Sequence, residues 1–167
     1  LSASIAEVMN SKAHFAQGDA VRPQVLKESD LIISDLPVGY YPDDAVASRY
    51  EVASPEEHTY AHHLLIEQSL KYLKPGGYAI FLAPNDLLTS KQSHLLKKWL
   101  LSKAQLLAMI VLPETIFSSS QHAKTLFVLR KQEETDIQPF IYLLQDLQNQ
   151  NEILKFRESF QNWRKDS

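Results

Sequence analysis

The sequence contains no cysteine. This absence excludes a disulfide-stapled scaffold and any metal site built from thiolates, and it is typical of proteins that work in a reducing compartment. The chain also lacks a continuous apolar run of roughly 18 residues and a secretory signal pattern, which excludes a membrane-spanning helix of ordinary length. We therefore expect a cytoplasmic protein without a membrane partner.

An excess of basic residues is also missing. Lysine and arginine number 17 against 20 aspartates and glutamates, and the formal net charge is −3 at pH 7. Proteins that bind nucleic acid through its phosphates usually carry clustered positive charge. The overall charge of this chain therefore gives no sign of such binding. The hydrophobic fraction of 44% and the length of 167 residues suit one globular domain with its own core.

Short apolar runs alternate with amphipathic segments along the chain. The periodicity predicts helices over 1–11, 60–73, 90–102 and 150–164, with a weak helix or turn over 21–29. It predicts strands over 13–17, 31–34, 78–83, 106–112, 125–130 and 140–144. This alternation favours an α/β fold with a doubly wound, mostly parallel sheet and helices on both faces.

Polar and aromatic residues gather where the predicted strands end. The stretch DLPVGYY at 35–41 follows a buried strand and presents a carboxylate, a rigid turn and two aromatic rings. Asp19, Pro84-Asn85 and the loop over 113–123 also follow predicted strands. Ligands of such sheets bind beyond the carboxyl ends of the strands, so we expect these stretches to face one ligand crevice.

These stretches carry a resemblance to a known family. SDLPVGYYP at 34–42, KPGG at 74–77 and FLAP at 81–84 resemble the N6-adenine DNA methyltransferases, and in particular a group of small methylase-like proteins of Gram-positive bacteria. The resemblance implies a Rossmann-like class I methyltransferase fold, S-adenosyl-L-methionine as cofactor and, for the intact protein, DNA as a partner. It makes residues 1–131 a partial catalytic domain and 132–167 a strand-plus-helix extension packed on the same domain.

The resemblance also implies roles for single residues. Asp35 would accept one hydrogen of the target amino group, and the backbone of Leu36 or Pro37 would accept the other, which aims the nitrogen lone pair at the methyl group. Pro37 would fix the turn, and Tyr40 would stack on a base flipped out of the duplex. The implied catalytic residues are therefore Asp35, Leu36, Pro37 and Tyr40.

Two further groups of residues follow from the same resemblance. Asp19 would accept from the adenine amino group of the cofactor. The implied cofactor-binding residues are Asp19, Ala20 and Asp35. The implied substrate-side residues are Tyr41, Pro84 and Asn85. The implied reaction is methyl transfer to an exocyclic amino group, N6 of adenine in DNA.

The chain departs from the family pattern in two ways. The usual tetrad is Asn or Asp, two prolines and an aromatic residue, whereas Leu36 replaces the first proline and Tyr40 lies three residues after Pro37. The glycine-rich loop for the methionine part of the cofactor and the acidic residue for its ribose are not found. We therefore expect a fragment with strands three to seven of the fold, inactive alone, whose exposed sheet edge promotes self-association.

Two other hypotheses stay open. One is a nucleic-acid-binding or regulatory protein that kept the fold without the chemistry, as the acidic balance favours. The other is a methylase of RNA, protein glutamine or a small molecule, because the same turn can present any planar amine or amide. We expect no metal site, because His58 and His62 lie one helical turn apart without an evident third ligand.

Overall fold

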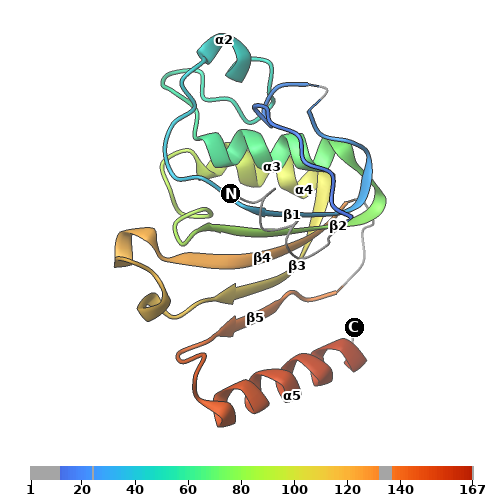
Figure 1. The fold of residues 1–167 in the computed structure, drawn as a ribbon, viewed down its shortest axis with the longest axis vertical. Coiled ribbons are helices and arrows are strands. Elements are labelled where there is room, and N and C mark those ends of the chain that lie inside the picture. Colours follow the sequence, from blue (N-terminus) through green and yellow to red (C-terminus); the bar gives the residue numbers. More distant parts are fainter. Residues whose placement is uncertain (1–11, 24, 132–136, 167) are drawn as a thin grey trace.

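The computed structural model describes residues 12–23, 25–131 and 137–166. The strands are β1 (Ser29–Asp35), β2 (Leu73–Pro84), β3 (Ala104–Val111), β4 (Lys124–Lys131) and β5 (Phe140–Leu143). The helices are α2 (Asp44–Ala47), α3 (Ala61–Tyr72), α4 (Ser93–Lys103) and α5 (Gln150–Asp166), with short 3-10 turns at Glu114–Ile116 and Ser120–His122 (Figure 1). No helix in these ranges is long and apolar enough to cross a membrane.

The five strands form one sheet in the order β1-β2-β4-β3-β5. β1 is parallel to β2, and β3 is parallel to β5, whereas β4 is antiparallel to both of its neighbours. Between β3 and β4 the chain returns through a loop with two short 3-10 turns, a connection that suits antiparallel strands. The predicted α/β fold is confirmed, with a mixed sheet in place of a mostly parallel one.

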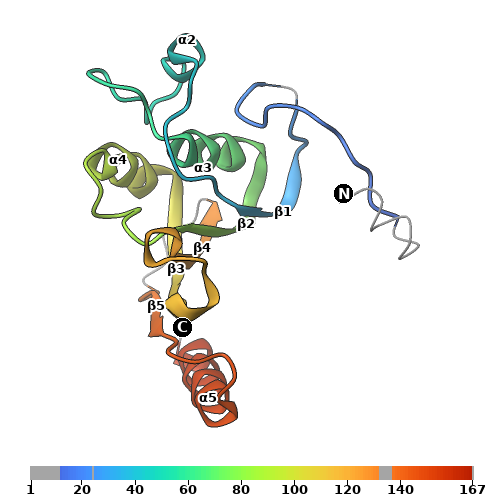
Figure 2. The same cartoon turned by 60° about the vertical axis from the view of Figure 1, so that its left-hand side comes forward.

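Apolar side chains cover both faces of the sheet. Along β4, Phe127 and Leu129 belong to one core cluster, whereas Leu126 and Val128 pack against a second one. Because successive side chains of a strand point to opposite faces, the two clusters lie on opposite sides of the sheet. Figure 2 shows α3 and α4 together over one part of the sheet and α5 apart from them near β5. The prediction of helices on both faces is confirmed.

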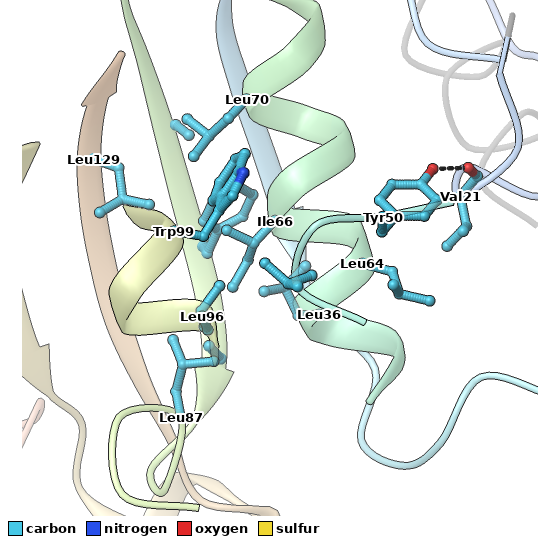
Figure 3. Packing of buried hydrophobic residues seen from close by; sticks show 14 of the residues in the cluster. Val21, Leu36, Tyr50, Leu64, Ile66, Leu70, Leu87, Leu96, Trp99 and Leu129 are labelled. Carbon is cyan, nitrogen blue, oxygen red and sulfur yellow. Dashed lines mark hydrogen bonds between the residues drawn. The ribbon is translucent and has the colours of Figure 1, made fainter. Parts of the chain in front are cut away.

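The larger cluster lies under α3 and α4 (Figure 3). Leu36, Leu64 and Leu96 are fully buried there, and they come from the end of β1, from α3 and from α4. Trp99 of α4 joins them with 7% of its surface exposed. The packing fixes the end of β1 against both helices, which positions the stretch that follows it.

The junction between α3 and β2 explains the KPGG motif. α3 ends at Tyr72, and β2 begins at once with Leu73, so the motif lies inside the first part of the strand. Gly76 has a φ of 75°, which favours glycine. A Cβ atom on Gly77 would lie 2.8 Å from the carbonyl oxygen of Asp30, so the motif lets β2 approach β1 closely.

One prediction for the first part of the chain is wrong: residues 13–17 are exposed and join no strand of the sheet. Where a weak helix or turn was expected over 21–29, residues 21–23 and 25–26 form turns and bends, and Ser29 begins β1. The local pattern of AHFAQ suits a strand, but a strand needs a partner, and in the described sheet β1 pairs only with β2. The predicted helix over 1–11 lies outside the described residues.

The outer end of the described sheet is apolar on one face. Leu31 and Ile33 of β1 have 50% and 68% of their surface exposed, whereas Ile32 between them packs against the larger cluster. An exposed apolar edge strand favours association with another chain. Self-association through this edge stays a prediction, as does the division of the chain at residue 131.

Candidate functional site

The carboxyl end of β1 holds the first two predicted catalytic residues in different surroundings. The Leu36 side chain is fully buried, and its backbone N–H donates to the carbonyl oxygen of Leu82 at 2.8 Å. The side chain of Asp35 is 67% exposed. Burial of Leu36 therefore fixes the backbone, while Asp35 presents its carboxylate beyond the end of the sheet.

Lys124 meets both predicted hydrogen-bond acceptors. Its Nζ donates to the carboxylate of Asp35 and to the carbonyl oxygen of Leu36, the latter at 2.8 Å. Lys124 is the first residue of β4 and lies opposite Pro84, the last residue of β2. Lys124 was not among the predicted site residues, because only the order of the strands brings β4 beside the end of β2.

Backbone hydrogen bonds join the turn after β1 to the start of α3. Gly39 has a φ of 115°, a conformation that favours glycine. Its carbonyl oxygen accepts from the N–H of Ala61 at 2.9 Å, and the N–H of Tyr41 donates to the carbonyl oxygen of Thr59 at 2.8 Å. The predicted turn at Pro37 is therefore held on its far side by a small antiparallel bridge between Tyr40 and Tyr60.

Tyr40 is the outer member of a stack of three rings. Its ring lies 4.8 Å from that of Tyr60 with an interplanar angle of 7°, and Tyr60 lies 5.1 Å from His62 at 18°. Tyr40 is 52% exposed, so its ring faces solvent. Tyr60 and His62 were not among the predicted site residues, since nothing in the local sequence links them to Tyr40.

Tyr41 connects the turn to Asp19. The Tyr41 hydroxyl donates to Asp19 Oδ2 at 2.5 Å, and the N–H of Val21 donates to Asp19 Oδ1 at 3.0 Å. Burial and the hydrogen bond to Asp19 raise the pKa of Tyr41 to about 12. The structure thus brings Asp19, with the half-buried Ala20 beside it, to the stretch that follows β1. Because Tyr41 is buried, the exposed ring of the turn is that of Tyr40.

The end of β2 approaches the same place. Pro84 is buried, and the exposed Asn85 follows it. Asn85 Oδ1 accepts from the Thr125 hydroxyl at 2.8 Å. Lys124 and Thr125 are adjacent residues that contact Asp35 and Asn85 respectively, so the start of β4 links the ends of β1 and β2. This linkage agrees with the expected convergence of polar groups at the carboxyl ends of the strands.

Two histidines near the start of α3 are buried, and one of them, His62, belongs to the ring stack. His62 and His63 are 3% and 0% exposed, and the ring of His63 has no hydrogen-bond partner among the described residues. Burial lowers the pKa of both, and that of His63 falls to about 3. No three His, Cys, Asp or Glu side chains within the described ranges lie together in a way that could hold a metal ion.

We expect His63 to make the stability of the protein depend on pH. An unfolded histidine binds a proton below about pH 6.5, whereas His63 in the folded chain stays neutral down to about pH 3. The unfolded state therefore binds more protons in this window, and the free energy of unfolding falls as the pH drops, by at most about 1.4 kcal/mol per pH unit. Urea denaturation at several pH values measures this slope.

The matched variants are His63→Leu and His94→Leu. The first removes the buried ring, and we expect its free energy of unfolding to fall less steeply with decreasing pH than that of the wild type. The second removes an exposed ring of α4 and is the control for the loss of one histidine from the chain. A His63→Leu variant with the wild-type slope would contradict the assignment.

Comparison with known proteins gives matches over nearly the whole chain. The model of the N-6 DNA Methylase family matches residues 4–163. YtxK of Bacillus subtilis, an uncharacterised protein, is 40% identical over 161 residues, which cover 95% of this chain and 49% of YtxK. The chain therefore spans about half the length of this relative.

Solved structures share the fold. A Listeria monocytogenes protein assigned to the class I S-adenosylmethionine-dependent methyltransferases superposes with a TM-score of 0.83 at 33% identity, over 95% of this chain and 50% of that one. The methyltransferase subunit of a type I restriction-modification system from Streptococcus thermophilus gives a TM-score of 0.62 at 14% identity, over 87% of this chain and 35% of that one.

Proposed function

Because the chain belongs to the N-6 DNA methylase family, we propose that the full-length protein transfers a methyl group from S-adenosyl-L-methionine to an exocyclic amino group, that of adenine in DNA. One observation carries the proposal. The carboxylate of Asp35 and the carbonyl oxygen of Leu36 both contact a single nitrogen atom, that of Lys124. Two acceptors that are directed at one nitrogen atom can hold an amine in a fixed orientation.

The chemistry requires such an arrangement. The lone pair of an exocyclic amino group is delocalised into its ring, so the free amine is a poor nucleophile. If Asp35 and the Leu36 carbonyl accept its two hydrogens, they direct the lone pair out of the ring plane, and their fixed positions contribute orientation and preorganised electrostatics. S-adenosyl-L-methionine would supply an electrophilic methyl group, and Asp35 with the Leu36 carbonyl would hold the amine nitrogen toward it.

Asp19 suits the role of a cofactor ligand. Its two oxygens already accept from Tyr41 and from the Val21 N–H. A carboxylate offers about four lone-pair positions, so Asp19 keeps acceptor capacity for the amino group of an adenosyl moiety. In this proposal Asp19 and Ala20, together with Asp35, contact S-adenosyl-L-methionine, which supplies an electrophilic methyl group when bound.

The ring stack supports a planar substrate. Tyr40 exposes half of its surface. Its ring stacks on that of Tyr60, which in turn stacks on that of His62. Stacking of a base on an aromatic side chain contributes about 1–3 kcal/mol. We propose that the target base stacks on Tyr40 and that the exposed Asn85 contacts it, while the buried Tyr41 and Pro84 support the substrate side from within.

Calorimetric titration of S-adenosyl-L-methionine into the full-length protein tests the proposal first. We expect binding, and we expect Asp19→Ala to weaken it because the acceptor for the adenosyl amino group is lost. Transfer of labelled methyl groups to adenine-containing DNA is the second measurement, with DNA that carries purine without the amino group as control. A protein that neither binds the cofactor nor modifies DNA would instead be a binding or regulatory protein that kept the fold.

A further inference from the structure

The nitrogen between the two acceptors belongs to the chain itself. We call the Asp35 carboxylate and the Leu36 carbonyl oxygen the acceptor pair. An ammonium group has three hydrogens, and Lys124 directs its group at both members of the pair. The Lys124 side chain is only 14% exposed, so the fold holds it in place. A substrate amine needs the same two acceptors and has to compete with this ammonium group.

Lys124 also balances the charge of the acceptor pair. Asp35 carries one negative charge and Lys124 one positive charge, so the two side chains offset one another in the ion pair that they form. A cationic alkylamine that approaches would meet no net attraction, and would have to displace a positive group of its own kind. A neutral aromatic amine faces no repulsion from Lys124. The displaced ammonium group can then pair with an anionic part of the ligand, such as a phosphate.

We propose that Lys124 is a specificity-determining residue: its ammonium group holds the amine position of the ligand-free protein and yields it to a neutral planar amine, not to a cationic alkylamine. This inference rests on the proposed function and names its substrate class. It separates nucleobase amines from lysine side chains and polyamines, all of which carry a nitrogen that an acceptor pair could bind.

Lys131 provides a matched control on the same strand. It is the last residue of β4, and its Nζ donates to the carbonyl oxygens of Leu73 at 2.5 Å and Lys71 at 3.2 Å. Lys131 therefore resembles Lys124 in chemistry, but it lies at the opposite end of β4 from Asp35. Replacing either lysine with methionine removes one positive charge, and only one of the two changes frees the acceptor pair.

The test measures binding rather than activity. Dissociation constants of two single-stranded oligonucleotides are measured with the full-length wild type, Lys124→Met and Lys131→Met. The oligonucleotides differ at one central base, which is adenine in the first and purine with hydrogen at C6 in the second. We expect the preference for adenine over purine to rise about tenfold in Lys124→Met and to stay unchanged in Lys131→Met. If the variant acted only through its loss of charge, the binding of both oligonucleotides would weaken equally.

A second measurement can overturn the inference with the wild type alone. Butylammonium should fail to compete with the adenine oligonucleotide for the wild type, and should compete in Lys124→Met, where Asp35 has lost its cation. Competition with the wild type would overturn the inference, even if Lys124→Met did not fold.

The remaining outcomes separate the inference from the proposed function. An unchanged or reduced adenine preference in Lys124→Met, with both oligonucleotides still bound, would overturn the inference and leave the proposed function standing. If neither the wild type nor any variant bound either oligonucleotide, the proposed function would fail, and the inference would fail with it.

Discussion

Asp35→Ala in the full-length protein is expected to lower kcat for methyl transfer by about 10²–10³-fold, the usual effect of removing one preorganised group that acts on the reacting atoms. The variant leaves the Leu36 carbonyl in place, because the Leu36 N–H still donates to Leu82 and the side chain stays buried. One of the two amine hydrogens then lacks its acceptor, and the nitrogen lone pair is no longer directed. Single-turnover methyl transfer to adenine-containing DNA measures the effect.

Asp30→Ala is the matched control for this experiment. Asp30 lies on the same strand, carries the same carboxylate and pairs with Lys74 at 3.0 Å, but at the amino end of β1. We expect it to keep wild-type kcat. Asp35→Asn retains an oxygen acceptor, so we expect its kcat to lie between those of Asp35→Ala and Asp30→Ala. Equal activity of Asp35→Ala and Asp30→Ala would exclude Asp35 from the reaction.

Glu67→Ala is expected to lower the free energy of unfolding by about 3–5 kcal/mol, because it breaks a buried, charged hydrogen-bond network by removing its centre. Glu67 is fully buried in α3. Its carboxylate accepts from the backbone N–H groups of Glu51 at 3.1 Å and Val52 at 2.9 Å, and it pairs with Lys71 at 2.6 Å. Urea denaturation followed by circular dichroism measures the loss.

Lys71→Ala is the appropriate comparison, because it removes the charged partner and leaves both backbone donors bound to Glu67. Lys71 is 43% exposed, but its loss leaves the buried Glu67 carboxylate without its cation, so we expect a loss in stability that is smaller than that of Glu67→Ala and not negligible. A Glu67→Ala variant as stable as Lys71→Ala would show that the two backbone bonds contribute little. The Glu67 network bears on the site as well, because Glu51 and Val52, which it binds, belong to the segment that precedes Tyr60.

Local patterns in the sequence predict those elements whose apolar spacing agrees with the structure that they form in the whole sheet. The alternation of apolar runs predicts β1, β3, β4 and α5 within a few residues, because the spacing of their apolar side chains matches the element that each forms. The expected strand over 13–17 fails for the opposite reason. Its pattern is suitable, but a strand forms only against a partner, and the identity of that partner is a property of the whole sheet.

The candidate site likewise combines residues that a local motif predicts with a residue that it does not predict. Asp35, Leu36 and Pro37 are adjacent in the chain, so a motif can point to them. Lys124 lies 89 residues from Asp35, and it reaches the acceptor pair only because β4 inserts between β2 and β3. Its place in the site follows from strand order, which no local pattern of this sequence encodes.

The placement of the two apolar clusters on opposite faces of the sheet gives the molecule a pair of separate optical reporters. The chain has two tryptophans. Trp99 packs in the cluster beneath α3 and α4, and Trp163 packs in the cluster of α5, where its indole N–H donates to the carbonyl oxygen of Gln138 at 2.7 Å. Each indole therefore senses one face, and their fluorescence distinguishes detachment of α5 from melting of the main core.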